Sequence, residues 1–211
     1  DRNVNPMTTE FNSEEYYSGR LAKSWEQTSP TNYLVELRQD VYWQDREPVN
    51  GRQFTSQDVV FNYDRILGTG HGYTEPNPYW SSEIIELKQV TAVDEFTVNF
   101  EFKSPAAMNI YQMFFDQIPL VPEEYVAPPD ETGLSPVDYP YDDINKVVGT
   151  GAWVLADCVP SVSATWNSNP NYYAYDEHFP DNKLPYADEL KMIAIQETST
   201  AIAALKTGKL D

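Results

Sequence analysis

Residues 147–173, VVGTGAWVLADCVPSVSATWNSNPNYY, decide how the second half of the chain folds. Their Gly149-Thr150-Gly151 resembles a phosphate loop, but such a loop runs into a helix and a Walker-type loop also needs a Lys. No Lys follows Gly151 here. Beyond a turn at Pro160, apolar residues alternate with polar ones at the period of a strand: Val162, Ala164 and Trp166. We therefore expect the two glycines to permit a sharp entry into a β-hairpin rather than to bind a nucleotide.

The composition indicates a globular protein with an acidic surface. The 211 residues are 41% hydrophobic, which is enough for a sizeable core, and the net charge is −19. Binding to nucleic acid or to anionic lipid is disfavoured, because both need Lys and Arg. The acidity either keeps the protein soluble, as in a saline environment, or attracts cationic ligands. No apolar run approaches the length of a membrane span, and no signal peptide is recognised.

Two segments of the first half have clear secondary-structure patterns. Residues 33–38 alternate apolar and polar side chains, which predicts a strand, and 41–43 continue the β character. The segment FTSQDVVFNYDRILG predicts a helix over 56–67. Thr55 is its expected N-cap, with Asp58 at the third helical position in a variant of the capping box.

Three further segments complete the first part of the chain. Alternation over residues 90–102 predicts a hairpin, and Ser104-Pro105 begins a helix expected to reach about residue 115. Residues 122–143 are rich in proline and carboxylates and contain no Lys or Arg. This composition predicts a surface excursion and a candidate boundary between two modules.

The end of the chain has the pattern of an α/β fold. Residues 190–195 predict a strand and 198–207 a helix, and such a pair normally leads to a second, parallel strand. That strand is missing here, so we expect the chain to be a piece of a longer protein. The single cysteine, Cys158, lies in a strand-like run, where a buried packing role is expected rather than a reactive thiol.

Short motifs occur along nearly the whole chain. In the first half they are LAKSW (21–25), LRQDVYWQDREP (37–48), TSQDVVF (55–61) and TVNFEFKSP (97–105). Farther along they are IPLVP (118–122), VGTG (148–151), NPNYY (169–173) and AALKTGKLD (203–211). Each motif is weak by itself. Their order and spacing resemble those of solute-binding proteins of peptide/nickel-type ABC importers, solute-binding family 5.

The resemblance implies an α/β fold, a periplasmic-binding-protein type II-like lobe present in part, with an inserted mixed α/β domain. Residues 1–15 and 147–211 would belong to lobe one and 16–146 to the inserted domain, with lobe two absent from this sequence. Gly149-Thr150-Gly151 would then lead from the inserted domain back into lobe one. The stretch before Gly19 is shorter than in the family.

The resemblance also implies a function. The protein would be the extracytoplasmic solute-binding component of an ABC importer, capturing a peptide or similar small solute between two lobes and delivering it to a membrane permease. It would be a monomer in the periplasm or outside the cell, lipid-anchored or secreted in its full-length form. The resemblance implies no cofactor and no nucleic-acid partner.

Three stretches are candidate ligand contacts by this resemblance. Residues after the motif-like Asn3-Val4-Asn5-Pro6 would supply backbone groups, or form an ordinary strand exit: Met7, Thr8, Thr9 and Glu10. Tyr79 and Trp80 lie where the inserted domain could reach the cleft, with packing against the helix as the competing role. Glu197 and Thr198 follow the end of a strand, where ligands of α/β folds bind. For Thr198 a helix cap is the competing role.

An enzyme is the alternative class. The two histidines, His71 and His178, form no His-x-x-His pair and there is no Cys cluster, so no metal site is predicted. Paired acids such as Asp142-Asp143 could suggest an extracellular carboxylate-based hydrolase, but they lie in an acidic run without a rigid scaffold. We therefore expect no catalytic residues. A binder would show only a ligand-induced shift in stability, whereas an enzyme would turn over a substrate.

Overall fold

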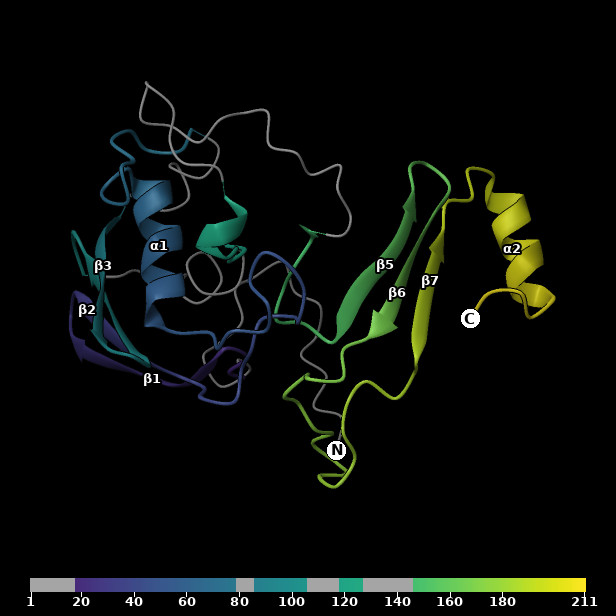
Figure 1. The fold of residues 1–211 in the computed structure, drawn as a ribbon, viewed down its shortest axis with the longest axis horizontal. Helices are drawn as coiled ribbons and strands as arrows, with labels where there is room; N and C mark the ends of the chain where they lie inside the picture. Colours follow the sequence, from purple (N-terminus) through teal and green to yellow (C-terminus); the bar gives the residue numbers. More distant parts are fainter. Residues whose placement is uncertain (1–17, 79–85, 106–117, 127–145) are drawn as a thin grey trace. The chain divides into compact units, whose positions relative to one another are not determined.

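The computed structural model describes residues 18–78, 86–105, 118–126 and 146–211 (Figure 1). These residues fall into two compact units. The first contains the described residues up to 41 and from 53 to 126, and the second contains 42–52 and 146–211. Most of the helix expected over 104–115 and most of the acidic segment over 122–143 lie outside the described residues.

The first unit is an antiparallel sheet with one helix against it. Its strands are β1 (Ala22–Ser29), β2 (Asn32–Leu37), β3 (Leu87–Asp94) and β4 (Thr97–Phe102), in the order β1-β2-β4-β3. Helix α1 (Ser56–Leu67) packs on β3 and β4, and the 3-10 helix η3 (Glu123–Tyr125) lies against α1 (Figure 1). The hairpin predicted over 90–102 is confirmed as β3 and β4.

The core of the first unit lies between α1 and the inner face of the sheet. Tyr33 and Val35 of β2 pair in register with Phe100 and Val98 of β4, and all four side chains are buried. Tyr63 of α1 meets Phe100 edge to face, with ring centroids 5.1 Å apart. Burial raises the pKa of the Tyr63 phenol far above its ordinary value. The apolar positions at period two therefore face the helix.

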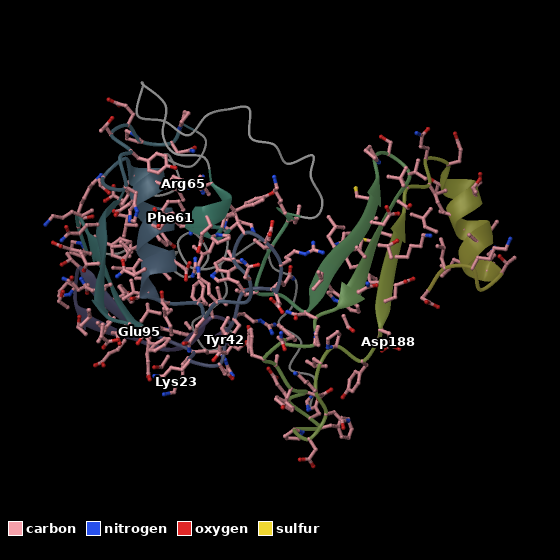
Figure 2. All side chains as sticks on the ribbon, in the orientation of Figure 1. Lys23, Tyr42, Phe61, Arg65, Glu95 and Asp188 are labelled. Atoms are coloured by element: carbon pink, nitrogen blue, oxygen red, sulfur yellow. The ribbon has the colours of Figure 1, made fainter. Side chains whose placement is uncertain are left out.

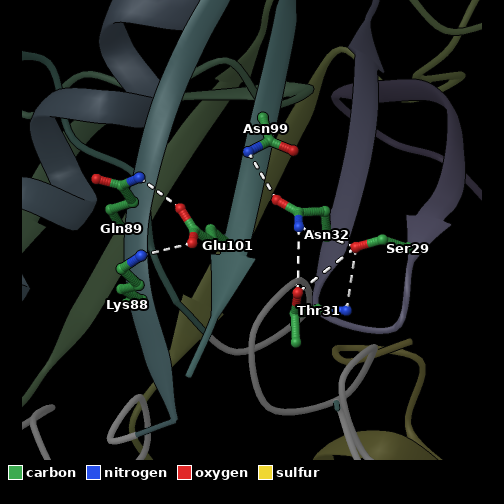
Figure 3. Close-up of polar contacts among 7 residues, drawn as sticks. All are labelled: Ser29, Thr31, Asn32, Lys88, Gln89, Asn99 and Glu101. Carbon is green, nitrogen blue, oxygen red and sulfur yellow. Dashed lines mark hydrogen bonds and ion pairs between the residues drawn. The ribbon is translucent and has the colours of Figure 1, made fainter. Parts of the chain in front are cut away.

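The outer face of the same sheet carries polar side chains (Figure 3). The Asn99 amide donates to Asn32 Oδ1 at 3.2 Å, and Lys88 lies 2.6 Å from Glu101. Hydrogen bonds from Lys88 and then from Gln89 hold the pKa of the Glu101 carboxyl below its ordinary value. The alternation predicted for 33–38 thus separates an apolar inner face from a polar outer one.

Helix α1 begins and ends at the residues predicted from the sequence. The Asp58 carboxylate accepts a hydrogen bond from the Thr55 backbone N–H at 2.9 Å, which confirms a capping box at the N-terminus. Gly68 ends the helix in the left-handed conformation, with φ of 69°. A Cβ there would collide with the backbone of Glu75, so only glycine fits.

The second unit is a three-stranded antiparallel sheet followed by a helix. The strands are β5 (Trp153–Val159), β6 (Ser163–Ser168) and β7 (Glu189–Ile193), in the order β5-β6-β7. Figure 2 labels Asp188 at the start of β7, where its carbonyl accepts from the Ser168 N–H at 2.8 Å. Helix α2 (Thr198–Lys206) follows β7. The predicted hairpin and strand–helix pair are confirmed.

Two expectations about single stretches were wrong. Cys158 is exposed, because the whole tip of the β5–β6 hairpin faces solvent, with Val159 43% and Val162 54% exposed. Residues 41–43 form no strand beyond an isolated bridge at Tyr42, although Val41 and Trp43 are buried. At the start of the acidic segment Pro122 and Tyr125 are buried while Glu123 and Glu124 are exposed, so the surface excursion expected over 122–143 stays a prediction.

Candidate ligand-binding site

Of the candidate contact residues, Glu197 and Thr198 lie within the described part of the chain. The others lie outside the described residues: Met7, Thr8, Thr9, Glu10, Tyr79 and Trp80. The geometry of the candidate site is therefore that of the connection from β7 to α2, together with the segment that enters β5.

The connection from β7 to α2 exposes both candidate side chains. Glu197 has extended backbone, and its carbonyl accepts from the N–H groups of Thr200 at 3.0 Å and Ala201 at 3.1 Å. Glu197 is therefore the N-cap residue, and Thr198 is the first helical residue. The helix-cap role considered for Thr198 is thus wrong, since the cap lies one residue earlier. A carboxylate and a hydroxyl face solvent at this helix N-terminus, where a ligand could accept from one and donate to the other.

The segment with the paired glycines enters a strand, as predicted. The chain bends over residues 150–152 and β5 begins at Trp153, so no helix N-terminus follows Gly151. The conformational reason predicted for the glycines was wrong. Neither has a left-handed backbone, a Cβ on Gly149 would meet its nearest neighbour at 3.9 Å, and one on Gly151 would meet nothing within 4 Å. A side chain therefore fits at both positions within the described structure.

Gln44 fixes this segment from within the 42–52 stretch. Its backbone N–H donates to the carbonyl of Gly149 at 2.9 Å, and its Nε2 donates to the carbonyl of Trp153 at 2.8 Å. The residue is 4% exposed, so these bonds satisfy an amide that would otherwise be costly to bury. Gln44 thus holds both ends of the bend that leads into β5.

Arg46 and Asn169 hold the same segment from two other sides. One guanidinium nitrogen of Arg46 donates to the carbonyls of Val147 at 3.2 Å and Leu155 at 3.0 Å. Asn169 Nδ2 donates to the carbonyl of Gly151 at 2.9 Å. The sequence did not show that Gln44 and Arg46 position this segment, because contacts between a side chain and a backbone about a hundred residues away leave no periodic pattern.

The described residues offer neither a metal site nor a membrane span. Their His, Cys, Asp and Glu side chains form no group of three that could bind a metal ion. Their helices include none with the length and apolar character needed to cross a membrane.

Solved structures with this fold are bacterial binding proteins. One is the ABC transporter-associated periplasmic binding protein DppA of Helicobacter pylori, in complex with the peptide STSA. It has a TM-score of 0.67 and 22% identity, covering 90% of this chain and 36% of that one. Another is the oligopeptide-binding protein AppA of Bacillus subtilis, in complex with a nonapeptide, with a TM-score of 0.67, 21% identity and coverage of 91% and 34%. At these identities the likeness shows the fold, that of a periplasmic binding protein present in part.

Sequence comparison then gives the family. Residues 17–211 match the family described as "Bacterial extracellular solute-binding proteins, family 5 Middle", and the chain belongs to this family. Two similar curated proteins are the Heme-binding protein A of Haemophilus influenzae and the Di/tripeptide-binding protein 1 of Pseudomonas aeruginosa. The first is 26% identical over 199 residues, covering 90% of this chain and 34% of the relative. The second is 26% identical over 173 residues, covering 78% and 31%.

The chain therefore spans about a third of the length of these curated relatives. The resemblance to solute-binding family 5 and the partial α/β binding-protein fold, both predicted from the sequence, are confirmed.

Proposed function

We propose that the complete protein is the extracytoplasmic solute-binding component of an ABC importer, which captures a small solute between two lobes and delivers it to a membrane permease. The observation that carries this proposal is the family match over residues 17–211. Proteins that bind dipeptides and tripeptides are among the relatives, so short peptides are the first ligand class to test. A heme-binding relative makes other small solutes the second class.

We propose that the protein binds its ligand and catalyses no reaction. Solute-binding proteins hold a ligand and release it unchanged, which requires no nucleophile and no general acid. Within the described residues the ionisable groups of the candidate site, Glu197 above all, lie exposed on a helix end rather than in an enclosed pocket with a partner base. An extracellular hydrolase is the alternative that the experiment below also examines.

The domain assignment and the contacts belong to the same proposal. Residues 1–15 and 147–211 form part of lobe one and 16–146 form the inserted domain. The ligand contacts are Met7, Thr8, Thr9, Glu10, Tyr79, Trp80, Glu197 and Thr198. The exposure of Glu197 and Thr198 at the end of the β7–α2 connection supports their inclusion.

The partners and location follow from the transport role. The protein acts as a monomer in the periplasm or outside the cell, lipid-anchored or secreted, with a peptide or small solute and a membrane permease as its partners. The net charge of −19 supports the exclusion of nucleic acid, because phosphate contacts need clustered Lys and Arg.

A thermal-shift panel on the complete protein tests this function. Dipeptides and tripeptides should raise the melting temperature as their concentration rises above Kd, because a ligand that binds only the folded state stabilises it. The same compounds should be recovered unchanged. Stabilisation by no member of a panel that includes peptides, amino acids and heme would contradict the binding role, and conversion of a compound would favour the hydrolase.

A matched pair of variants tests the contact at Glu197. Glu197→Ala should weaken the affinity for a stabilising peptide at least tenfold, which corresponds to about 1.4 kcal/mol. Asp157→Ala removes an exposed carboxylate of β5 in the same unit and should leave the affinity unchanged. Equal effects of the two variants would mean that only net charge matters and that Glu197 is not a contact.

A further inference from the structure

The loop between β6 and β7 presents three aromatic side chains to solvent. Tyr175, Phe179 and Tyr186 are 53%, 63% and 62% exposed. The loop projects beyond the ends of the strands of the second unit (Figure 1). Large apolar side chains that gather on a protein surface commonly mark an interaction site.

Asp176 links the two arms of this loop through its carboxylate. One of its carboxylate oxygens accepts from the backbone N–H groups of His178 at 2.7 Å and Phe179 at 3.0 Å, and the other accepts from the Tyr186 hydroxyl at 2.7 Å. Tyr175 is its neighbour in sequence. The hydrogen bond from Tyr186, and then that from His178, hold the pKa of the Asp176 carboxyl below its ordinary value. Asp176 therefore fixes the backbone at Phe179 and the position of the Tyr186 hydroxyl.

Backbone bonds close the loop across its base. The Asp176 N–H donates to the carbonyl of Asn182 at 2.9 Å, and the Leu184 N–H donates to the carbonyl of Ala174 at 3.0 Å. Tyr175 and Lys183 form an antiparallel bridge between the two arms. The loop is therefore ordered by contacts within its own residues.

These internal contacts distinguish the loop from helix α2, whose exposed apolar residues lie in the same unit. Helix α2 has nine residues and none of them is buried, although Ile202 and Leu205 lie on one side. A helix this short is unstable in water without tertiary packing, so its apolar side needs further residues to cover it. The loop needs no such cover to hold its shape, so its exposed aromatic side chains can serve a contact with another molecule.

The chemistry of the loop fits a protein partner. Tyrosine on a rigid scaffold loses little conformational entropy on binding and is a frequent hot spot, and phenylalanine is enriched at protein interfaces. The exposed carboxylates of Glu177 and Asp181 flank Phe179, and the chain as a whole carries a charge of −19. This charge disfavours an anionic membrane surface as the partner. It favours a protein with an apolar pocket bordered by basic side chains.

Resting on the proposed function, we infer that the 175–186 loop is a docking surface for the extracytoplasmic face of the importer's permease. Tyr175 and Phe179 insert into apolar pockets of the permease, while Glu177 and Asp181 lie opposite its basic side chains. Tyr186 has a different role, since its hydroxyl holds Asp176 and thereby keeps the loop in its binding shape.

Site-specific photo-cross-linking tests the contact directly. p-Benzoylphenylalanine is placed at position 179 of the complete protein in cells that make the permease, and at position 162 as the control. Val162 is also exposed and belongs to the same unit, on the β5–β6 turn. We expect a cross-link to a permease subunit from position 179 and none from 162. A cross-link from 179 only to the protein's own remaining chain, or to no permease subunit, overturns the inference.

A reconstituted assay separates docking from ligand capture. The double variant Tyr175→Ser/Phe179→Ser keeps the Asp176–Tyr186 bond, and Val162→Ser is its matched control. With a stabilising dipeptide, the double variant should show the wild-type thermal shift. It should need about tenfold more binding protein to half-stimulate ATP hydrolysis by the permease, a loss of about 1.4 kcal/mol. Val162→Ser should behave as wild type.

The outcomes of this assay are distinguishable. Wild-type stimulation by the double variant at wild-type concentration overturns the docking surface and leaves the solute-binding role intact. A wild-type protein that neither binds a panel member nor stimulates ATP hydrolysis overturns the proposed function and the docking surface together.

Discussion

Asn62 of α1 pairs with the backbone of Val121 in the way that a neighbouring strand would. Asn62 Nδ2 donates to the Val121 carbonyl at 2.7 Å, and the Val121 N–H donates to Asn62 Oδ1 at 3.1 Å. Asn62 Nδ2 also donates to the carbonyl of Asp58 in the same helix, with a nitrogen-to-oxygen distance of 2.8 Å. The Asn62 side chain is fully buried, so one satisfied amide joins α1 to the segment that leads into η3.

Removing this amide should destabilise the first unit. Asn62→Ala leaves the half-buried backbone groups of Val121 without this partner and removes a fully buried amide, and we expect a loss of about 2 kcal/mol in the free energy of unfolding. Urea unfolding followed by tryptophan fluorescence measures it. Asn99→Ala is the control, because Asn99 bonds to a side chain on the outer face of the sheet, and should cost under about 1 kcal/mol. Equal losses in the two variants would refute the special role of Asn62.

The capping box at the start of α1 gives a second prediction. Asp58→Ala removes the acceptor of the Thr55 N–H and should lower the free energy of unfolding by about 1–2 kcal/mol. Thr55→Ala should cost ~1 kcal/mol, the usual loss for a capping side chain. Gln57→Ala, an exposed change in the same turn, should alter the stability by less than about 0.5 kcal/mol. Melts of both cap variants that overlay the wild type would remove the cap from the description of α1.

Arg46 should stabilise the segment that leads into β5. Arg46→Ala removes two charge-assisted hydrogen bonds to the carbonyls of Val147 and Leu155, a local loss of roughly 2 kcal/mol. Hydrogen exchange should therefore accelerate at the amides of β5. The amides of α1, in the other unit, are the internal control and should keep their rates. Equal acceleration in both units, or none in β5, would contradict the prediction.

The bond between Asp176 and Tyr186 should operate within a defined pH window. The pKa of Asp176 is lowered in the folded protein, so its ionised carboxylate stabilises the fold. This stabilisation is present above the ordinary pKa of 3.8 and is lost as pH falls through the lowered pKa. The pKa of Tyr186 is raised, mainly by its bond to Asp176, so its contribution is present below 10.0 and is lost as pH rises through the raised value. The bond is therefore complete between these ordinary values.

NMR titration of the Asp176 carboxyl carbon tests this window. In Tyr186→Phe the pKa of Asp176 should rise toward its ordinary value, because the largest cause of the shift is removed. Tyr42→Phe removes an exposed hydroxyl elsewhere in the same unit and should leave the titration unchanged. An unaltered Asp176 titration in Tyr186→Phe would show that the hydroxyl bond does not form.

Local patterns in the sequence predicted much of the fold. Helix α1 could be bounded to the residue, because Thr55, Asp58 and Gly68 each act within one turn of the helix end. The β3–β4 hairpin followed from alternation about a short turn. Strand β1 was missed, because it is an edge strand whose side chains are mostly exposed and show no alternation.

Contacts between distant segments could not be predicted in this way. Asn62 meets Val121, and Arg46 meets Leu155, through side chains bound to backbone carbonyls, and any residue type supplies a carbonyl. The exposure of Cys158 depends on what covers the hairpin tip, which a strand pattern does not encode. For the site, resemblance to a family supplied the candidates, and Glu197 and Thr198 are the two of them that lie within the described residues.

Isothermal titration tests most directly the claim that the ligand is held between two lobes. One set of dipeptides and tripeptides is titrated into the complete protein and into this 211-residue chain. The complete protein should bind with micromolar or tighter Kd. The chain alone should show at best millimolar binding, on the order of 4 kcal/mol, because a half-site buries one side of the ligand while association keeps its full entropic cost. Equal affinity in the two would contradict the claim, because the site would then lie wholly within residues 1–211.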